Sequence, residues 1–297
     1  MIEMVIEQRR QRLGATFEVG RVLPFARRRM VGPFIFFDHI GPVDLAPGLD
    51  RNADVRPHPH IGLSTVTYLF SGEIMHRDSL GFEQPIRQEE VNWMTAGSGI
   101  THSERFELAR RSGDRLHGIQ AWVALPTEYE ETAPSFSHHA GDDLPRWSEA
   151  GVTGRLIAGG AYGLAAGVRT HSPLFYVYLH LAKGATAGLP DGYKERAVYI
   201  ATGTLEVDGV SYGAGRMLVV TAAASRIRAL EESTVMVLGG EPLGERFLFW
   251  NFVSSSEDRL AQAAADWKAG RMKLPDGDDD EFIPLPESLP SSRPASS

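Results

Sequence analysis

The chain has 297 residues, of which 42% are hydrophobic and 23% charged, and its formal net charge is −8. This composition is typical of a globular protein with one large domain or two smaller ones, and the acidic balance argues against direct nucleic-acid binding. The absence of cysteine excludes disulfides, zinc–thiolate sites and cysteine nucleophiles. Because the N-terminus lacks the apolar core of a secretory signal and no long apolar run occurs, we expect a cytoplasmic protein without membrane contact.

Short apolar runs separated by turn residues follow one another along the chain. β-branched and aromatic residues are frequent in them, which is typical of the short strands of a sandwich or barrel. The clearest runs are 63–70, 119–125, 174–181 and 197–201, each followed by a glycine or proline turn. We therefore predict an all-β fold.

A weak internal repeat divides the chain. The sequence Tyr-Leu-Phe-Ser-Gly at 68–72 returns as Tyr-Ile-Ala-Thr-Gly at 199–203, about half a chain length further on. Two copies of one β-domain explain this spacing. We place the join near Pro134, which gives a first domain at 1–133 and a second at 134–297.

One helix is expected near the C-terminus, at about 256–270. Ser254 to Glu257 resembles a capping box with Ser254 as the cap, and Leu260 and Trp267 follow at helical spacing. Gly270 is a plausible stop. Beyond it the sequence becomes rich in Asp, Pro and Ser, and we expect a disordered tail from about residue 288.

Two short motifs carry the candidate chemistry: His58-Pro59-His60 and His102-Ser103-Glu104. On a strand, side chains at i and i+2 point to the same face, roughly 7 Å apart. If the two strands are neighbours, three imidazoles and one carboxylate converge. Such a donor set suits a divalent transition metal and leaves coordination positions open, as in catalytic or exchangeable sites. The alternative is that each pair is only the polar face of a strand.

The remaining histidines lack this pattern. We expect a solvated loop at His138-His139 and a satisfied buried side chain at His39. Without a partner at ligand spacing, four others are predicted to be structural: His76, His117, His171 and His180. In the second half, Leu189 and Asp191 take the places of His58 and His60, so the second domain is predicted to bind no metal.

Several long segments resemble the pirin family, namely 31–39, 56–81, 91–105, 239–256 and 281–286. Members of this family are bicupins, with two antiparallel β-barrels in tandem and a metal in the first. The resemblance implies that His58, His60, His102 and Glu104 are the ligands, the same four residues that the spacing selects. Several bacterial members resemble quercetin 2,3-dioxygenases, whereas eukaryotic pirin is an iron-containing nuclear regulator.

These features lead to a metal-dependent dioxygenase as the first functional hypothesis. It would use one divalent metal, Fe(II) before Ni, Mn, Cu or Zn, to cleave a flavonol-like (quercetin-like) aromatic substrate with O2. Glu104 is the candidate general base, and Trp93, Met94 and Phe106 are candidate pocket residues, unless they are simply core. The alternatives are a non-catalytic regulatory or protein-binding module, such as a redox sensor with a protein partner, and a bicupin whose metal only braces the strands.

Overall fold

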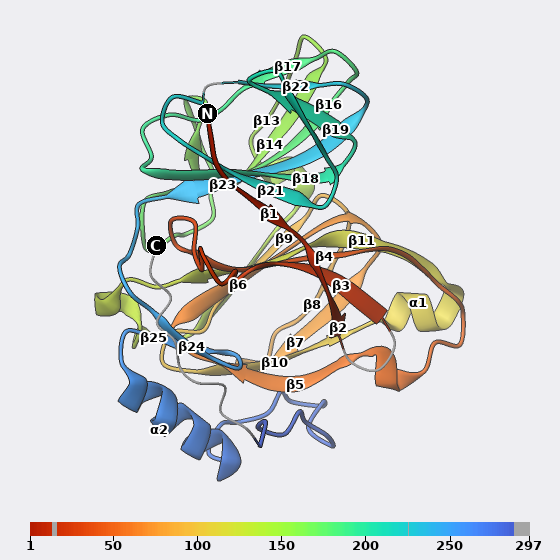
Figure 1. The fold of residues 1–297 in the computed structure, drawn as a ribbon. Helices are drawn as coiled ribbons and strands as arrows, with labels where there is room; N and C mark the ends of the chain where they lie inside the picture. The colour runs from red at the N-terminus through yellow and green to blue at the C-terminus, as the bar shows by residue number, and fades with distance from the viewer. Residues whose placement is uncertain (14–16, 225, 288–297) are drawn as a thin grey trace.

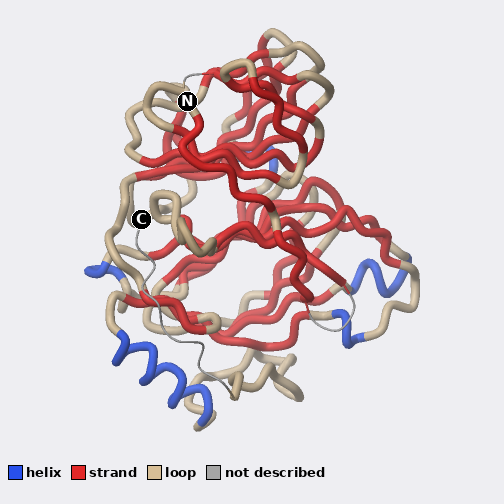
Figure 2. Tube along the Cα trace, viewed as in Figure 1, coloured by secondary structure: helices blue, strands red, loops and turns tan. Residues whose placement is uncertain are grey.

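The structure is a computed structural model that describes residues 1–13, 17–224 and 226–287; the tail predicted from about residue 288 lies outside this part of the chain. Strands dominate, and helix is confined to short peripheral segments (Figure 2). The all-β prediction is therefore confirmed. Among the described residues, no helix has the length and apolar character needed to cross a membrane.

The strands form two β-barrels that lie one above the other (Figure 1). In the first barrel, one sheet has the order β12-β9-β6-β11-β4-β3-β2 and the other the order β5-β10-β7-β8. Their bounds are β2 Arg9–Leu13, β3 Phe17–Leu23, β4 Phe34–Leu45, β5 Val55–His60, β6 Leu63–Ser71, β7 Ile74–Asp78, β8 Glu83–Ile86, β9 Val91–Thr95, β10 Ile100–Arg105, β11 Asp114–Ala124 and β12 Ser135–His139.

The second barrel repeats this arrangement. Its larger sheet has the order β1-β21-β18-β23-β16-β14-β13, with β15 beside β14, and its smaller sheet the order β17-β22-β19-β20. Their bounds are β1 Ile2–Glu7, β13 Arg146–Glu149, β14 Val152–Ala161, β15 Leu164–Ala165, β16 Leu174–Leu181, β17 Thr186–Gly188, β18 Glu195–Thr202, β19 Thr204–Val207, β20 Val210–Gly213, β21 Arg216–Val220, β22 Arg226–Ala229 and β23 Ser233–Gly240.

The repeat seen in the sequence marks the same place in both barrels. Tyr68 lies on β6 and Tyr199 on β18, and each of these strands is central in its sheet. Gly72 and Gly203 end the two strands with φ angles of 91° and 84°, a left-handed conformation that favours glycine. An added Cβ at Gly203 would also lie 2.6 Å from the Glu232 carbonyl oxygen, so this turn has no room for a side chain.

Strand pairing crosses the join that the sequence suggested. β12, which begins just after Pro134, pairs with β9 of the first barrel, and β1 pairs with β21 of the second. The N-terminal strand β1 therefore belongs to the larger sheet of the second barrel, although it comes first in the chain. The division of the chain into 1–133 and 134–297 stays a prediction. Strands β1 and β12 each pair with the barrel on the other side of that division.

The two barrels share one apolar core. Its buried side chains come from the larger sheet of each barrel, with Val66 and Phe37 on one side and Tyr176 and Met217 on the other. The ring of Phe37 lies 4.9 Å from that of Tyr199, in an edge-on arrangement. Because this layer is continuous and almost fully buried, the barrels form one unit.

A buried hydrogen-bond chain also joins the barrels through His39, as predicted a satisfied buried histidine. The Tyr199 hydroxyl donates to Gln8 Oε1 (2.8 Å), so its oxygen can accept from His39 Nδ1–H (2.8 Å). His39 Nε2 then accepts from His117 Nε2–H (2.8 Å). Burial, and to a lesser degree His117, lowers the pKa of His39 to about 3, and the neutral ring is the form that fits.

Acid is therefore expected to weaken the protein at this point. His39 titrates near pH 6.5 in the unfolded chain but near 3 in the folded one, so the unfolded state binds the extra proton below about pH 6.5. The free energy of unfolding should fall by about 3 kcal/mol between pH 7 and pH 4 from this residue alone. Urea unfolding across that range should show a shallower pH slope in His39→Gln than in His180→Gln, whose ring is exposed. An equal slope would contradict the assignment.

The C-terminal segment returns from the second barrel to the first. After β23 it forms a hairpin, β24 Phe247–Phe249 and β25 Phe252–Ser254, and then helix α2, Glu257–Lys268, at the lower edge of the first barrel (Figure 1). Leu260 and Trp267 of α2 pack on Phe249 and Phe252 of the hairpin. The short C-terminal helix is therefore confirmed. A shorter helix, α1 Glu107–Ser112, follows β10, and three single turns complete the regular elements: Arg51–Ala53, Thr127–Tyr129 and Gly141–Asp143.

The predicted cap of α2 is wrong by two residues. Ser256 is the N-cap and its hydroxyl oxygen accepts from the backbone N–H of Arg259. Ser254 instead ends β25, and its hydroxyl donates to the buried carboxylate of Glu130 (2.8 Å). Glu130 also accepts from the backbone N–H of Ser255 (2.9 Å). A carboxylate from a distant part of the chain therefore holds the residues that come just before the helix.

Candidate metal centre

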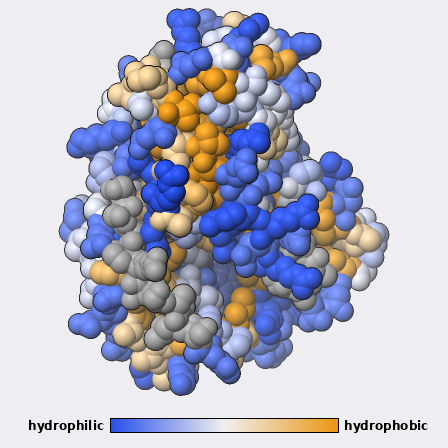
Figure 3. All heavy atoms as spheres, viewed as in Figure 1, coloured by the Kyte–Doolittle hydropathy of each residue, from blue (hydrophilic) through white to orange (hydrophobic). Residues whose placement is uncertain are grey.

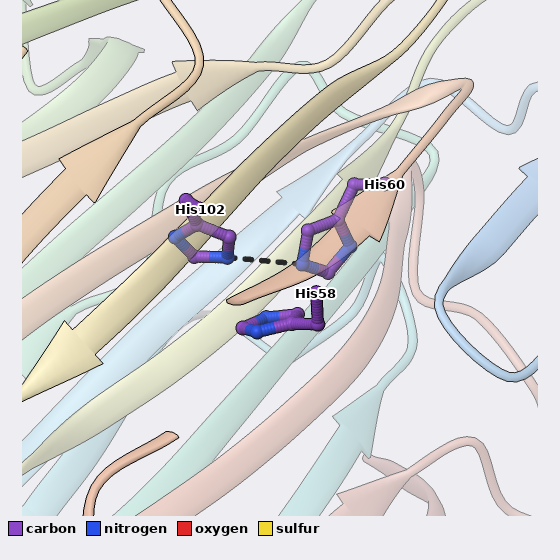
Figure 4. A group of neighbouring side chains, drawn as sticks. All are labelled: His58, His60 and His102. Carbon is purple, nitrogen blue, oxygen red and sulfur yellow. Dashed lines mark hydrogen bonds between the residues drawn. The ribbon is translucent and has the colours of Figure 1, made fainter. Parts of the chain in front are cut away.

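The two motifs lie on neighbouring strands, as the spacing argument required. β10 pairs with β5 in antiparallel register, with His102 directly opposite His58. One ring nitrogen each from His58, His60 and His102 lies within 4.8 Å of the others, and all three side chains are buried. Figure 4 shows the three rings turned toward one another from the two strands. These three residues could hold a metal ion.

Burial keeps the three imidazoles neutral. Loss of solvent is the largest cause in each case: it lowers the pKa of His58 to about 4 and that of His60 and His102 well below 6.5. Mutual repulsion between the rings adds to the effect at His60 and His102. Neutral imidazole is the form that binds a metal, so the site is prepared for a cation at neutral pH.

Backbone carbonyls orient two of the rings. His58 Nδ1 donates to the Arg56 carbonyl oxygen (2.8 Å), and His60 Nδ1 donates to the Asn251 carbonyl oxygen (3.2 Å). With the proton held on Nδ1, the lone pair of each ring lies on Nε2. Asn251 belongs to the hairpin between β24 and β25, so the C-terminal segment fixes a ligand of the first barrel.

The third ring is oriented by a histidine and a carboxylate. His76 Nε2 donates to Asp78 Oδ2 (2.9 Å), which leaves His76 Nδ1 as an acceptor for His102 Nδ1–H (3.3 Å). The Asp78 carboxylate is held in turn by the backbone N–H groups of Leu80 and Phe82. His102 therefore also presents its lone pair on Nε2. Such partners of ligand histidines fix ring orientation and raise ligand basicity.

The geometry of the ring nitrogens fits a bound cation. His60 Nε2 lies 3.1 Å from His102 Nε2 (Figure 4), and the hydrogen bonds behind both rings leave both atoms as acceptors. Two acceptor lone pairs at this distance repel each other, and a metal ion that binds both removes that repulsion. Three neutral imidazoles of this kind suit Zn, Cu, Fe or Ni.

Glu104 shares the cavity with these rings but does not belong to the compact group of three. The register between β10 and β5 shifts after His102, so Glu104 lies opposite Val55. Burial raises the pKa of the Glu104 carboxyl to about 7. Its roles as fourth ligand and as base stay predictions.

A cavity of about 430 Å³ opens in front of the site and is lined by His58, His60 and Glu104. Its apolar wall includes Phe36 and Trp122, whose rings stack with centroids 4.0 Å apart. This volume lies in the range of small-molecule sites, about 300–1,000 Å³. The cavity therefore has the size of a small-molecule site.

The candidate pocket residues divide between wall and core. Phe106 lines the cavity, as suggested. Trp93 instead lies in the core shared by the barrels, and Met94 packs with Ala96 and Ile100. Alternation along β9 places the two on opposite faces of the strand, Trp93 toward the shared core and Met94 toward Ile100 of β10.

Two further expectations about histidines need correction. His76 does have a partner at i+2, Asp78, and the pair stands behind His102; an H-x-D pattern on a strand was the available signal. His138 and His139 do not lie in a solvated loop. They end strand β12 and are half-buried, with His138 Nδ1 2.8 Å from Asn92 Oδ1. No local signal marks Asn251, because its contact with His60 spans 191 residues.

Two antiparallel barrels with a histidine site inside the first define a bicupin. The family comparison gives the same class: the Pirin family model matches residues 16–123, and the Pirin C-terminal cupin domain matches residues 176–273. The chain belongs to the pirin family.

Individual relatives agree with this assignment. A pirin-like protein of Caulobacter vibrioides is 61% identical, over 97% of this chain and 100% of the relative. Pirin-1 of Arabidopsis thaliana is 31% identical, over 73% of this chain and 77% of the relative. A crystal structure of quercetin 2,3-dioxygenase from Acinetobacter baumannii is similar with a TM-score of 0.90 and 32% identity, and the match covers 99% of this chain and 98% of that one.

Proposed function

We propose that the chain is a metal-dependent dioxygenase that cleaves flavonol-type aromatic substrates with O2. The observation that carries the proposal is the set of three buried imidazoles whose lone pairs converge at the end of an aromatic-walled cavity. The relationship to a quercetin 2,3-dioxygenase supports the choice of substrate. His58, His60 and His102 would hold the metal, Fe(II) first among the candidates, and Glu104 would be the fourth ligand.

The residues around the cavity have distinct tasks in this proposal. A bound metal would supply Lewis acidity toward a substrate hydroxyl and the redox chemistry needed for reaction with O2. The stacked pair of Phe36 and Trp122 gives the cavity an apolar aromatic wall against which an aromatic substrate can pack. Glu104, with its pKa near 7, can take the proton of a substrate hydroxyl at neutral pH.

Oxygen uptake with quercetin tests the proposal. The metal-loaded protein should consume O2 with quercetin, and Glu104→Gln should lower the rate by about 10²-fold or more, since the amide cannot accept the proton. Glu149→Gln is a suitable control, because Glu149 is exposed on β13 of the second barrel. Metal content measured alongside separates loss of the base from loss of the metal.

Two outcomes would contradict the enzyme. Full metal occupancy without oxygen uptake would favour the non-catalytic regulatory alternative. Unchanged uptake in Glu104→Gln would remove Glu104 from the reaction and leave the metal site intact.

A further inference from the structure

Two arginines stand side by side at the outer end of the cavity. Arg9 on β2 is the direct cross-strand partner of Arg21 on β3. Like charges placed directly opposite each other on a sheet are destabilising unless something compensates them. The compensation differs between the two residues.

Arg21 is neutralised within the protein. Its Nε donates to Asp38 Oδ1 (2.9 Å) and its Nη2 donates to Asp38 Oδ2 (2.8 Å), a bidentate pair with a buried carboxylate. The guanidinium also lies 4.5 Å above the centre of the Phe36 ring. Arg21 is therefore held in place, and its charge is already used.

Arg9 keeps its charge. Its Nη2 donates to the carbonyl oxygens of Pro24 (2.6 Å) and Val22 (3.4 Å), which position the group without cancelling a full charge. In the described part of the chain, no carboxylate forms an ion pair with Arg9. Burial, and then the charge of Arg21, lowers the pKa of Arg9, while the charge of Asp38 acts in the opposite direction.

A second cavity, of about 310 Å³, connects Arg9 with the metal site. It is lined by Arg9, Gln11, Arg21, Pro24, Phe36, Trp122, Leu248 and Trp250, and it shares five of these residues with the metal cavity. None of the described residues that line it is acidic. Figure 3 shows hydrophilic residues gathered on the surface where β2 and β3 lie. Arg12, exposed on β2, lines the metal cavity and adds a further positive charge there.

We propose that this cavity takes an aromatic oxyanion: an aromatic ring packed beside the stacked pair of Phe36 and Trp122, with a carboxylate or sulfonate substituent bound by Arg9. Since Arg9 Nη2 already donates to the Val22 and Pro24 carbonyls, such a group would accept a charge-assisted hydrogen bond from Nε or Nη1 of Arg9. The inference rests on the proposed function for the metal end of the ligand. It adds that Arg9 selects anionic substrates over neutral ones.

Calorimetric titration of the metal-loaded protein with a matched pair of ligands tests this. Quercetin and quercetin 5′-sulfonate share the flavonol and differ by one negative charge. The sulfonate is expected to bind about 10-fold more tightly or better, as for a charge-assisted hydrogen bond. In Arg9→Gln, which keeps a donor for the Pro24 carbonyl, most of this preference should disappear.

Arg10→Gln is the matched control, because Arg10 is the next residue on β2, is 88% exposed, pairs with Glu18 and is not among the described residues that line either cavity. It should keep the preference. If Arg9→Gln does not fold, Arg12→Gln should still reduce the preference, and 0.5 M salt should reduce it in the unchanged protein.

Equal affinity for both ligands in the unchanged protein, or an undiminished preference in Arg9→Gln, would overturn this inference and leave the metal site standing. Failure of both ligands to bind to the metal-loaded protein would overturn the proposed function as well.

Discussion

Replacement of His102 by alanine is expected to weaken metal binding by more than about 100-fold, so that the purified protein loses nearly all its metal. The loss should exceed the 10- to 100-fold effect known for residues that only orient a ligand, because His102 itself supplies a lone pair. It also leaves only His58 and His60 of the three imidazoles. Elemental analysis of protein purified without an affinity tag measures the occupancy directly.

Two comparisons make this result specific. His180→Ala, on an exposed part of β16, should keep its metal, since this side chain is 39% exposed and far along the chain from the site. Metal should also raise the melting temperature of the unchanged protein and not that of His102→Ala, because a ligand of the folded state alone stabilises it. Normal metal content in His102→Ala would exclude the three imidazoles as the site.

Replacement of Arg105 by leucine is expected to cost about 3–5 kcal/mol of folding free energy. Arg105 is 2% exposed and pairs with Asp278 through two hydrogen bonds, of 2.9 and 2.5 Å. It also lies 3.0 Å from Glu281. Without the guanidinium, the buried carboxylate of Asp278 has lost its counter-charge. Urea unfolding should show the loss.

The same substitution should release the C-terminal segment before the barrels unfold. Ser103 donates to Asp278 (2.5 Å) from the same outer face of β10, so this strand carries metal ligand on one face and segment anchor on the other. Limited proteolysis should cut Arg105→Leu near residues 270–285 under native conditions. Arg115→Leu, which breaks an exposed pair with Asp44, should change stability by less than about 1 kcal/mol and resist the protease. Equal resistance of Arg105→Leu would contradict the anchoring role.

The parts of the site that sequence could predict are those that depend on local geometry. Side chains two apart on a strand share a face, which brought together His58 with His60 and placed Glu104 beside His102. Glycine at the turns marked the ends of equivalent strands in the two barrels. These features depend only on residues that are close together in the chain, so the sequence is enough to predict them.

The parts that could not be predicted depend on distant contacts. The register shift that sets Glu104 apart from the three rings arises between two strands more than 40 residues apart, and no residue type announces it. Asn251 reaches His60 only because a later hairpin folds back. Ser254 lost its expected role as helix cap because Glu130 competes for its hydroxyl. In each case a tertiary partner decides between local alternatives.

The position of Asn251 has a consequence for the order of events on the ribosome. All three imidazoles and His76 are made within the first 102 residues, yet the carbonyl that orients His60 is made almost 150 residues later. The strand Ile2–Glu7, in turn, must wait for Arg216–Val220 before it has a partner. A nascent chain that already holds the strands of the first barrel therefore lacks the carbonyl that orients His60. Its first strand, β1, also still lacks its pairing partner β21. A metal held by these three rings would therefore find its final geometry only after Asn251 has been made.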